Sequence, residues 1–340
     1  MEFKKGTKIL FIFIIIVNLI MCTSLVVLYG PWPYFRNTWI TTAMATMKHQ
    51  YLAHWFYSDK TIEEIMINNT VIESDESTDV SLIDEEIAPV VYTDKYEEQI
   101  LSKENEDDIY KIVDISDTSY KGFLVAIYDA SKISMVTTRF LGTKGETLDN
   151  IAKNNKALLA INASGFLDPE WRGNGGEPTG SIVKNGAIVW SATRPNAGGG
   201  VIGFTYNNKL VLTKESMKSA LVNYNLRDAI EFGPFLIVNG KPSFVKGNGG
   251  WGIAPRTAIG QRQDGIVLLL IIDGRNPGYS IGADMVDLTE IMQKYKAYNA
   301  ANLDGGASTG LIVNNSIYNK PCALSYNGLR RLPNAWIVTE

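Results

Sequence analysis

A long apolar run near the N-terminus is the strongest hydrophobic feature of the chain. Residues 9–29 read ILFIFIIIVNLIMCTSLVVLY without a charged side chain, and about 20 apolar residues let an α-helix cross about 30 Å of hydrocarbon. Lys4, Lys5 and Lys8 precede the run, and basic residues stay on the cytoplasmic side of a membrane. Residues 1–30 are therefore predicted to be a transmembrane signal-anchor that leaves the rest of the chain outside the cell. A cleaved signal peptide is the alternative, although its apolar part is usually shorter.

An amphipathic, aromatic-rich segment follows at residues 31–70. Residues 31–35 read PWPYF, and aromatic side chains favour the headgroup boundary of a membrane. Residues 38–57 predict a helix, because Trp39, Trp55 and the apolar residues between them fall on one stripe. We expect this helix to lie on the membrane or to pair with a second copy in a homo-oligomer. Packing against its own domain is the alternative.

Charge is concentrated in residues 71–108. This stretch contains fourteen Asp or Glu against two lysines, a net charge of −12, whereas the whole chain carries −4. Few aromatic residues and a high net charge are typical of segments that cannot bury enough surface to fold. The stretch is predicted to be an acidic linker that extends by self-repulsion. The remaining chain is net positive, which is compatible with an anionic ligand.

Regular apolar segments begin at residue 109. Segments 121–129 and 132–138 are predicted to be paired strands. A helix near 146–156 and a buried strand at 157–162 follow. This succession is typical of a globular domain rather than of a repeat or a disordered tail.

Turn signals separate the later apolar runs. Asn-Gly and Asp-Gly pairs supply the positive φ angles that tight hairpins need. The four signals are Asn185-Gly186, Asn207-Asn208, Asn239-Gly240 and Asp264-Gly265. The run at 265–273 is too uniformly apolar for a half-exposed strand and is predicted at the centre of a sheet. Residues 285–297 are predicted to form a helix, and 301–305 to end another strand.

These elements predict the fold class α+β (mixed α/β). We expect one domain, residues 109–340, with a mixed, hairpin-rich β-sheet and a few packed helices. The transmembrane helix precedes this domain in the sequence.

The absence of histidine restricts the chemistry of this domain. The two histidines of the chain, His49 and His54, precede residue 109. A Ser-His-Asp triad, a Cys-His dyad and a His-bound zinc site are thereby excluded from residues 109–340. Cys22 and Cys322 lie in contexts that do not favour a mutual disulfide. Catalysis has to use carboxylates, Tyr, Lys, Arg or a metal bound through oxygen.

Five polar, glycine-rich clusters each follow an apolar strand, where sites usually gather. They are NASGF (162–166), GNGGEPTG (173–180), APRTAIG (254–260), IIDGR (271–275) and NLDGGAST (302–309). A single Asp-Gly after a strand is most often a turn. Asp273 and Asp304, however, end consecutive strands joined by a helix, so they would share one sheet edge if those strands are parallel neighbours.

Taken in order across residues 160–310, these clusters resemble the phosphodiester glycosidase family, whose animal member is the "uncovering enzyme". The matching pattern is Asn162 with Gly165-Phe166, Pro178 and Gly180 before SIVKNG, EFGPFLIVNGKP, PRTAIG, the strand ending in DGR, and AYNAANLDGGAST. The resemblance does not cover the anchor, the aromatic segment or the linker, and the design is that of a bacterial, membrane-anchored member. It implies hydrolysis of the bond between a sugar's anomeric carbon and an esterified phosphate.

The resemblance also implies roles for residues of this chain. Such chemistry needs stabilisation of an oxocarbenium ion, activation of water and a clamp for the leaving phosphodiester. The implied catalytic carboxylates are Asp304 and Asp273, with Glu177 as a third candidate acid. The implied substrate-binding residues are Arg256 as phosphate clamp, Asn162 and Ser308 as positioning groups, and Gly305, Gly306 and Arg275 beside them. For Arg256 an ion pair, and for Asn162 a turn-stabilising role, are the alternatives.

The expected substrate is a phosphodiester-linked glycan of the cell envelope or an exopolysaccharide. The residues identify no certain cofactor; Ca²⁺ or Mg²⁺ bound through oxygen is compatible with these loops, although no ligand spacing demands it. We expect no nucleic-acid partner. Two other functions remain open: a non-catalytic module that binds or assembles envelope polysaccharide, and a phosphodiesterase or transferase that cuts the phosphate side of the linkage.

Overall fold

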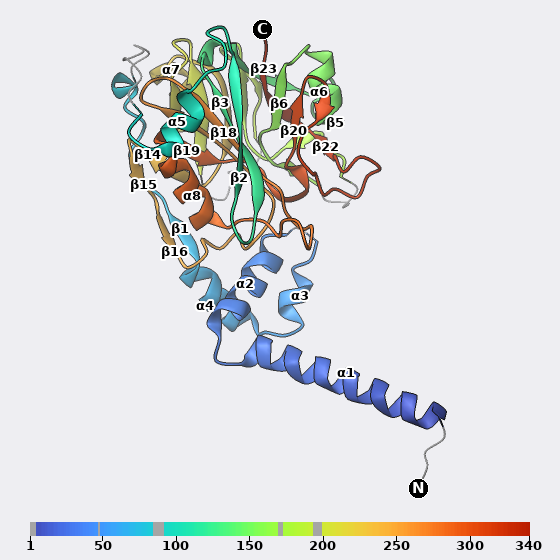
Figure 1. Cartoon of the computed structure of the whole chain (residues 1–340). Helices are drawn as coiled ribbons and strands as arrows, with labels where there is room; N and C mark the ends of the chain where they lie inside the picture. The colour runs from blue at the N-terminus through green and yellow to red at the C-terminus, as the bar shows by residue number, and fades with distance from the viewer. Residues whose placement is uncertain (1–4, 47, 84–91, 169–172, 193–198) are drawn as a thin grey trace.

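The N-terminal apolar run is one continuous helix. Figure 1 shows a computed structural model of the chain, which describes residues 5–46, 48–83, 92–168, 173–192 and 199–340. Helix α1 spans Lys5–Tyr29, and its stretch Gly6–Tyr29 is long and apolar enough to cross a membrane. A signal sequence shares these properties. Lys4, which contributed to the predicted orientation, lies outside the described residues.

Three short helices form a small cluster after α1. They are α2 (Pro33–Met44), α3 (Tyr51–His54) and α4 (Asp59–Asn68). Ile40, Ala53 and Ile62 are buried together with Leu28 from the end of α1. The prediction of one helix over 38–57 is wrong, because the chain turns back after α2 so that α2 and α3 bury their apolar sides against each other.

The acidic segment is folded against the domain, so the prediction of an extended linker at 71–108 is wrong wherever the structure describes it. Strand β1 (Thr70–Ile72) pairs with β16 (Phe244–Lys246). The 3₁₀-helix η1 (Val80–Leu82) and helix α5 (Lys95–Leu101) follow, while 84–91 lie outside the described residues. Local composition failed here because the carboxylates find fixed donors elsewhere in the chain.

Glu73 is an example of an acidic side chain in this segment that is bound by groups of the domain. Its carboxylate accepts hydrogen bonds from Phe235 N at 2.5 Å and Gly199 N at 3.1 Å. It also lies 2.9 Å from Lys214 Nζ, and its side chain is largely buried. The segment therefore supplies an acceptor to two backbone N–H groups of the domain.

Glu73→Ala is expected to lower the free energy of unfolding by about 2–3 kcal/mol, because two N–H groups and an ammonium lose their partner. Glu76→Ala is the matched control, since Glu76 forms an exposed ion pair with Lys241 that contributes little. Denaturant unfolding of the full chain in detergent measures both. Equal stability of the two variants would contradict the assigned role of Glu73.

The rest of the chain folds into three main sheets. The largest has the order β15-β14-β19-β17-β18-β3-β2, and the two others are β10-β9-β13-β11-β12 and β21-β20-β6-β23-β4. The seven strands of the largest are β2 (Tyr110–Ser116), β3 (Lys121–Ile127), β14 (Phe235–Val238), β15 (Lys241–Pro242), β17 (Arg256–Arg262), β18 (Val267–Ile272) and β19 (Ala297–Asn302). The second contains β9 (Ile182–Lys184), β10 (Ala187–Trp190), β11 (Gly200–Thr205), β12 (Leu210–Thr213) and β13 (Leu226–Phe232). The third contains β4 (Ile133–Thr137), β6 (Leu159–Asn162), β20 (Leu311–Val313), β21 (Ser316–Ile317) and β23 (Asn334–Val338).

Short ribbons and helices complete the domain. Two ribbons pair β5 (Glu146–Thr147) with β22 (Arg331–Leu332), and β7 (Phe166–Leu167) with β8 (Glu177–Pro178). The helices are α6 (Leu148–Asn154), α7 (Met217–Asn223) and α8 (Met285–Lys294), and the short 3₁₀ turns are η2 (Ala130–Lys132) and η3 (Gly306–Ser308).

The three sheets enclose one central core, and a helix covers the outer face of each. Leu269 of β18, Ile161 of β6 and Ile202 of β11 belong to the central core. Helix α8 packs outside the seven-stranded sheet, α6 outside the sheet that contains β6, and α7 outside the sheet that contains β11. Each fully buried aliphatic side chain contributes about 1.5–3 kcal/mol to this packing.

Strand β18 has the central, doubly buried position that its composition predicts. Successive side chains of a strand point to opposite faces, and both faces are apolar here. Val267, Leu269 and Ile271 face the central core, while Leu268, Leu270 and Ile272 face α8.

The predicted α+β class is confirmed, with two differences in pairing. All four predicted hairpins form: β9–β10, β11–β12, β14–β15 and β17–β18. Asn185 and Gly186 both have positive φ, as their turn requires. The predicted partners β3 and β4 do not pair, because η2 carries the chain from one sheet to another. Among the described residues every strand pair is antiparallel, so the sheets are less mixed than predicted.

Candidate active site

Polar side chains gather where β18 and β19 end. Both strands pair antiparallel with β17, so they run in the same direction and end at the same edge of the sheet. Asp273 follows β18 and Asp304 follows β19. The two strands are not direct neighbours, because β17 lies between them. The shared edge was therefore predicted correctly from the βα order, although the pairing was not.

Asn162, at the end of β6, connects this edge to a second sheet. Its Nδ2 donates to the backbone oxygen of Asp304 at 2.6 Å. Its Oδ1 accepts from Thr257 Oγ1 at 2.8 Å and from Gly310 N at 3.2 Å. The side chain is completely buried. Asn162 thus fixes both ends of the loop that carries Asp304.

The Asp304 residue is partly buried. Hydrogen-bond donors and arginines near its carboxyl affect its pKa. Burial raises the pKa of its carboxyl, while the Ser308 hydroxyl, Arg330, the Gly305 N–H and Arg275 oppose this increase. The Gly305 N–H donates to Oδ1 at 3.0 Å. Burial thus raises the pKa of the Asp304 carboxyl while the charges of Arg330 and Arg275 lower it, and perturbed carboxyls of this kind are common at functional sites.

Ser308 has a buried hydroxyl beside this carboxyl. Its interaction with Asp304 is strong enough to lower the carboxyl pKa, but within the described residues Oγ makes no hydrogen bond of ordinary geometry. A buried hydroxyl without a full partner is costly in a folded protein. Such a group is available to a ligand that enters the site.

Arg275 and Arg330 flank Asp304 from two different segments. Arg275 is exposed and has a φ of +56°, and its Nη2 would lie 3.0 Å from a Cβ placed on Gly306. Gly306 itself has a φ of +61°, so a side chain is disfavoured there twice. The N–H groups of Gly305 and Gly306 already donate to Asp304 Oδ1 and Pro255 O. The N–H groups of these glycines are therefore already used within the protein. What Gly306 contributes is space for the Arg275 guanidinium.

Arg330 is held more firmly than Arg275. Its guanidinium carbon lies 4.3 Å from the centre of the Phe166 ring, and Nη2 lies 3.5 Å from Asp168 Oδ2. Asp168 is buried and also accepts from Gly173 N. The sequence predicted neither Arg330 nor Asp168 as a site residue, because Asp168 follows a short strand and Arg330 lies in a segment without a motif.

Arg256 has a different setting from the one predicted for a phosphate clamp. Its guanidinium is buried, with Nε donating to Ala283 O at 3.0 Å and Nη2 donating to Trp251 O and Gly252 O. Burial lowers its pKa to about 10. Nε and Nη2 of Arg256 thus donate to carbonyl groups behind the site.

Asp273 also has its oxygen atoms occupied. Oδ1 accepts from Asn319 Nδ2 at 2.9 Å and from Lys320 N at 3.0 Å, and Oδ2 accepts from Tyr279 OH at 3.2 Å. Burial raises the pKa of the carboxyl. Asp273 joins the loop after β18 to the segment after β21.

Glu177 lies on the β7–β8 ribbon at the side of the site. It is partly buried and pairs with Leu167, next to the pair Phe166–Pro178. Phe166 is the ring beneath Arg330. Among the residues that the structure describes, no three His, Cys, Asp or Glu side chains converge as a metal site would require.

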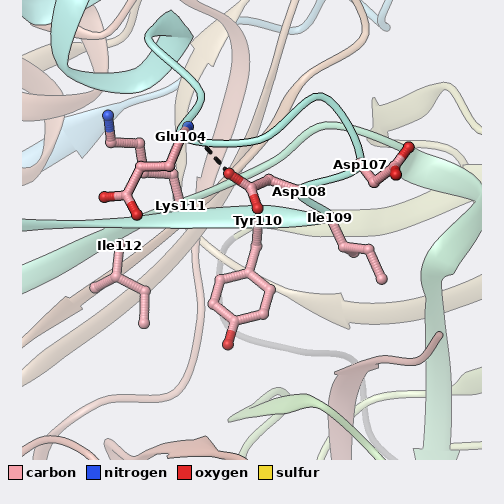
Figure 2. Close-up of a pocket in the computed structure, with 7 residues that line it drawn as sticks. All are labelled: Glu104, Asp107, Asp108, Ile109, Tyr110, Lys111 and Ile112. Carbon is pink, nitrogen blue, oxygen red and sulfur yellow. Dashed lines mark hydrogen bonds between the residues drawn. The ribbon is translucent and has the colours of Figure 1, made fainter.

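Figure 2 shows a surface hollow at the other end of the sheet. Glu104 and residues 107–112 line it, and of these Glu104, Asp107 and Asp108 are acidic. Tyr110 in this lining and Val267 both pair with Ile127, so the hollow lies at the end of β18 opposite Asp273. Its negative charge and position make it an unsuitable site for a phosphodiester.

Comparison with known proteins identifies the family. Residues 155–339, which include Asn162, Asp304 and Arg330, match the phosphodiester glycosidase family. The chain belongs to this family. The predicted membership is therefore confirmed, and the match extends beyond the motifs by which the sequence resembled the family.

The chain matches only part of the length of each curated relative. The SPbeta prophage-derived uncharacterized protein YomE of Bacillus subtilis (strain 168) is 30% identical over 200 residues, which is 56% of this chain and 30% of that protein. The N-acetylglucosamine-1-phosphodiester alpha-N-acetylglucosaminidase of Bos taurus is 31% identical over 81 residues, 24% of this chain and 15% of that enzyme. The matched segments thus span less than a third of either curated relative.

A solved structure supports the fold. The catalytic domain of zebrafish N-acetylglucosamine-1-phosphodiester alpha-N-acetylglucosaminidase has a TM-score of 0.57 and 21% identity, over 71% of this chain and 87% of that one. At this identity the likeness concerns the fold alone.

Proposed function

We propose that this chain is an extracytoplasmic hydrolase that cleaves the bond between the anomeric carbon of a sugar and a phosphodiester. The observation that carries the proposal is the partly buried Asp304 carboxyl between Arg275 and Arg330. Membership of the phosphodiester glycosidase family supports it. The substrate is a phosphodiester-linked glycan of the cell envelope or an exopolysaccharide.

The reaction separates charge in a way that these residues are suited to stabilise. As the bond from the anomeric carbon to the phosphate oxygen breaks, positive charge develops on the sugar and negative charge on the leaving phosphate. Asp304 stabilises the sugar cation and accepts a proton from the attacking water. Arg275 and Arg330 stabilise the leaving phosphate, which keeps the bridging oxygen. The products are the free sugar and a phosphomonoester.

The other predicted site residues support the position of Asp304 or border it. Asn162 fixes the Asp304 loop, Asp273 fixes the segment after β21, and Arg256 supports the backbone behind Gly305. We propose these three as positioning residues. Ser308 offers its buried hydroxyl to a sugar hydroxyl, and Glu177 is kept as a further acid at the side of the site.

Release of free sugar from a soluble phosphodiester tests the proposal. The full chain in detergent is incubated with UDP-N-acetylglucosamine and with phosphodiester-linked cell-wall glycan. We expect free sugar from both, together with UDP from the first substrate and a phosphate monoester from the second. Saturable glycan binding without product would favour the non-catalytic binding module instead. Sugar that leaves with its phosphate would favour a phosphodiesterase or transferase.

The pH dependence follows from the shifted pKa of Asp304. The reacting form is the carboxylate, so kcat/KM should rise with pH and fall as pH drops through an apparent pKa above the ordinary value of about 4. Ser308→Ala removes an interaction that lowers this pKa. The variant should therefore shift the midpoint to higher pH. Rate profiles between pH 3 and 8 measure the shift, and a midpoint unmoved or lowered in the variant would contradict the assignment.

A further inference from the structure

The N-terminal helices lie against the same edge of the domain as the candidate active site. Thr42 Oγ1 of α2 accepts from Ile253 N at 3.1 Å, and Thr41 Oγ1 accepts from Asn248 Nδ2 at 2.8 Å. Gly252 has a φ of +58°, and a Cβ there would lie 2.4 Å from Thr42 Cα. Helix α2 is therefore in direct contact with segment 248–253.

Segment 248–253 runs directly into the backbone behind Asp304. Pro255 O accepts from Gly306 N at 2.8 Å, and Arg256 donates to Trp251 O. Only a few residues thus separate α2 from the loop that carries Asp304. The catalytic edge is joined to the N-terminal helices, whereas the hollow in Figure 2 lies at the opposite end of the sheet.

The helix cluster is in turn fixed to the end of α1. Tyr57 OH donates to Leu28 O at 2.7 Å, and Tyr29 OH donates to Phe56 O at 2.6 Å. Large aromatic side chains on this cluster point outward instead of into a core. They are Trp32, Tyr34, Phe35, Trp39, Tyr51 and Trp55. Exposed aromatic residues directly after a membrane-spanning helix are suited to the headgroup boundary.

A second apolar projection stands beside the site. The loop between β21 and β22 carries Leu324 and Tyr326, which are fully exposed. Its shape is fixed by hydrogen bonds from Ala323 N to Gly328 O and from Ser325 Oγ to Leu329 O, each 2.8 Å. The base of the loop is held by Asp273. In Figure 1 this dark red loop projects from the side of the domain toward which α1 extends.

We propose that the helix cluster and the tip of this loop contact the membrane that holds α1, so that the active site faces the bilayer and cleaves a sugar-1-phosphodiester whose second ester group is a membrane lipid. The inference rests on the proposed function and on α1 remaining attached to the chain. Water attacks the anomeric carbon, the free sugar leaves, and the lipid keeps the phosphate as a monoester. Lipid-linked substrate is confined to the surface that the site faces, which raises its effective concentration.

The test compares two substrates that carry the same sugar. The full chain in liposomes is supplied with bilayer-embedded polyprenyl phosphate N-acetylglucosamine or with soluble UDP-N-acetylglucosamine, and we expect the lipid substrate to be preferred at least about tenfold in kcat/KM. The double variant Leu324→Ser/Tyr326→Ser should lower turnover of the lipid substrate about tenfold and leave turnover of the soluble substrate unchanged. Val222→Ser, which changes another exposed apolar residue, on α7, is the control and should change neither.

The outcomes separate the two proposals. No turnover of either substrate would overturn the proposed function. Turnover of the soluble substrate with no preference for the lipid, and no effect of the double variant, would overturn the lipid assignment alone.

A second measurement does not depend on the sugar. In a Cys22→Ser/Cys322→Ser background, an environment-sensitive nitrobenzoxadiazole dye is attached at Tyr326→Cys or at Val222→Cys. We expect blue-shifted emission from the liposome-bound chain at position 326 and water-like emission at position 222. Water-like emission at both positions would contradict the membrane contact.

Discussion

Asp304→Asn is expected to lower kcat/KM by about 10²–10⁴-fold, the range that a positioned acid–base group contributes. The amide is neutral, so it neither stabilises a sugar cation nor accepts a proton from water. The amide oxygen can still accept the hydrogen bond from Gly305 N, which now goes to Oδ1. Asn162 holds the backbone oxygen of residue 304, not its side chain. The loop should therefore keep its shape.

Thermal unfolding shows whether Asp304→Asn loses activity because catalysis is impaired or because the variant is less stable. Burial raises the pKa of Asp304, so the fold disfavours its charge, and an uncharged amide should change the free energy of unfolding by less than about 1 kcal/mol. Asp129→Asn is the control, because Asp129 is an exposed N-cap that Asn replaces well. An Asp304→Asn variant that folds and keeps more than a tenth of the activity would remove Asp304 from the mechanism.

Loss of either site arginine should have the second-largest effect. Arg275→Ala and Arg330→Ala are each expected to lower kcat/KM by about 10²-fold, as removal of one donor to a developing anion typically does. Lys at either position keeps the charge but not the paired N–H groups, so it should recover only part of the activity. The loss should shrink for substrates whose phosphate is a better leaving group, because such a phosphate needs less stabilisation.

The two arginines differ in how much they contact the rest of the protein. Comparing their variants therefore distinguishes an effect on stability from an effect on catalysis. Arg275 is exposed, so its replacement should leave the thermal transition in place. Arg330 packs on Phe166 and pairs with Asp168, so its replacement should also lower stability. Arg331→Ala, at the exposed neighbouring position, is the control. Full activity in Arg275→Ala would contradict the proposed anion clamp.

Local signals in the sequence predicted the hairpins and the central strand well. Asn185-Gly186 and Asn239-Gly240 force positive φ within two residues, so nothing distant has to be known. The uniformly apolar sequence of β18 likewise specifies burial on both faces. The predicted pairing of β3 with β4 was wrong because their actual partners, β18 and β23, lie far along the chain.

Non-local contacts explain what the sequence did not reveal about the site. Asn162, Asp304, Ser308 and Arg275 follow glycine-rich strand ends, and these positions do come together. Arg256 has the same kind of local context, but its Nε and Nη2 donate to three carbonyl groups from two other segments. The acidic segment was misjudged for the same reason, since Glu73 finds its partners at Gly199, Lys214 and Phe235.

The position of β23 has a consequence for biogenesis. This strand lies between β4 and β6 in its sheet, and Asn334 bonds to Ser164, 170 residues earlier in the chain. Strands β4 and β6 therefore emerge from the ribosome long before the segment that joins them, and such distant pairing forms slowly. A chain that crosses a membrane during synthesis has to remain unfolded until it arrives. For the extracytoplasmic location proposed above, late closure of this sheet would provide that delay.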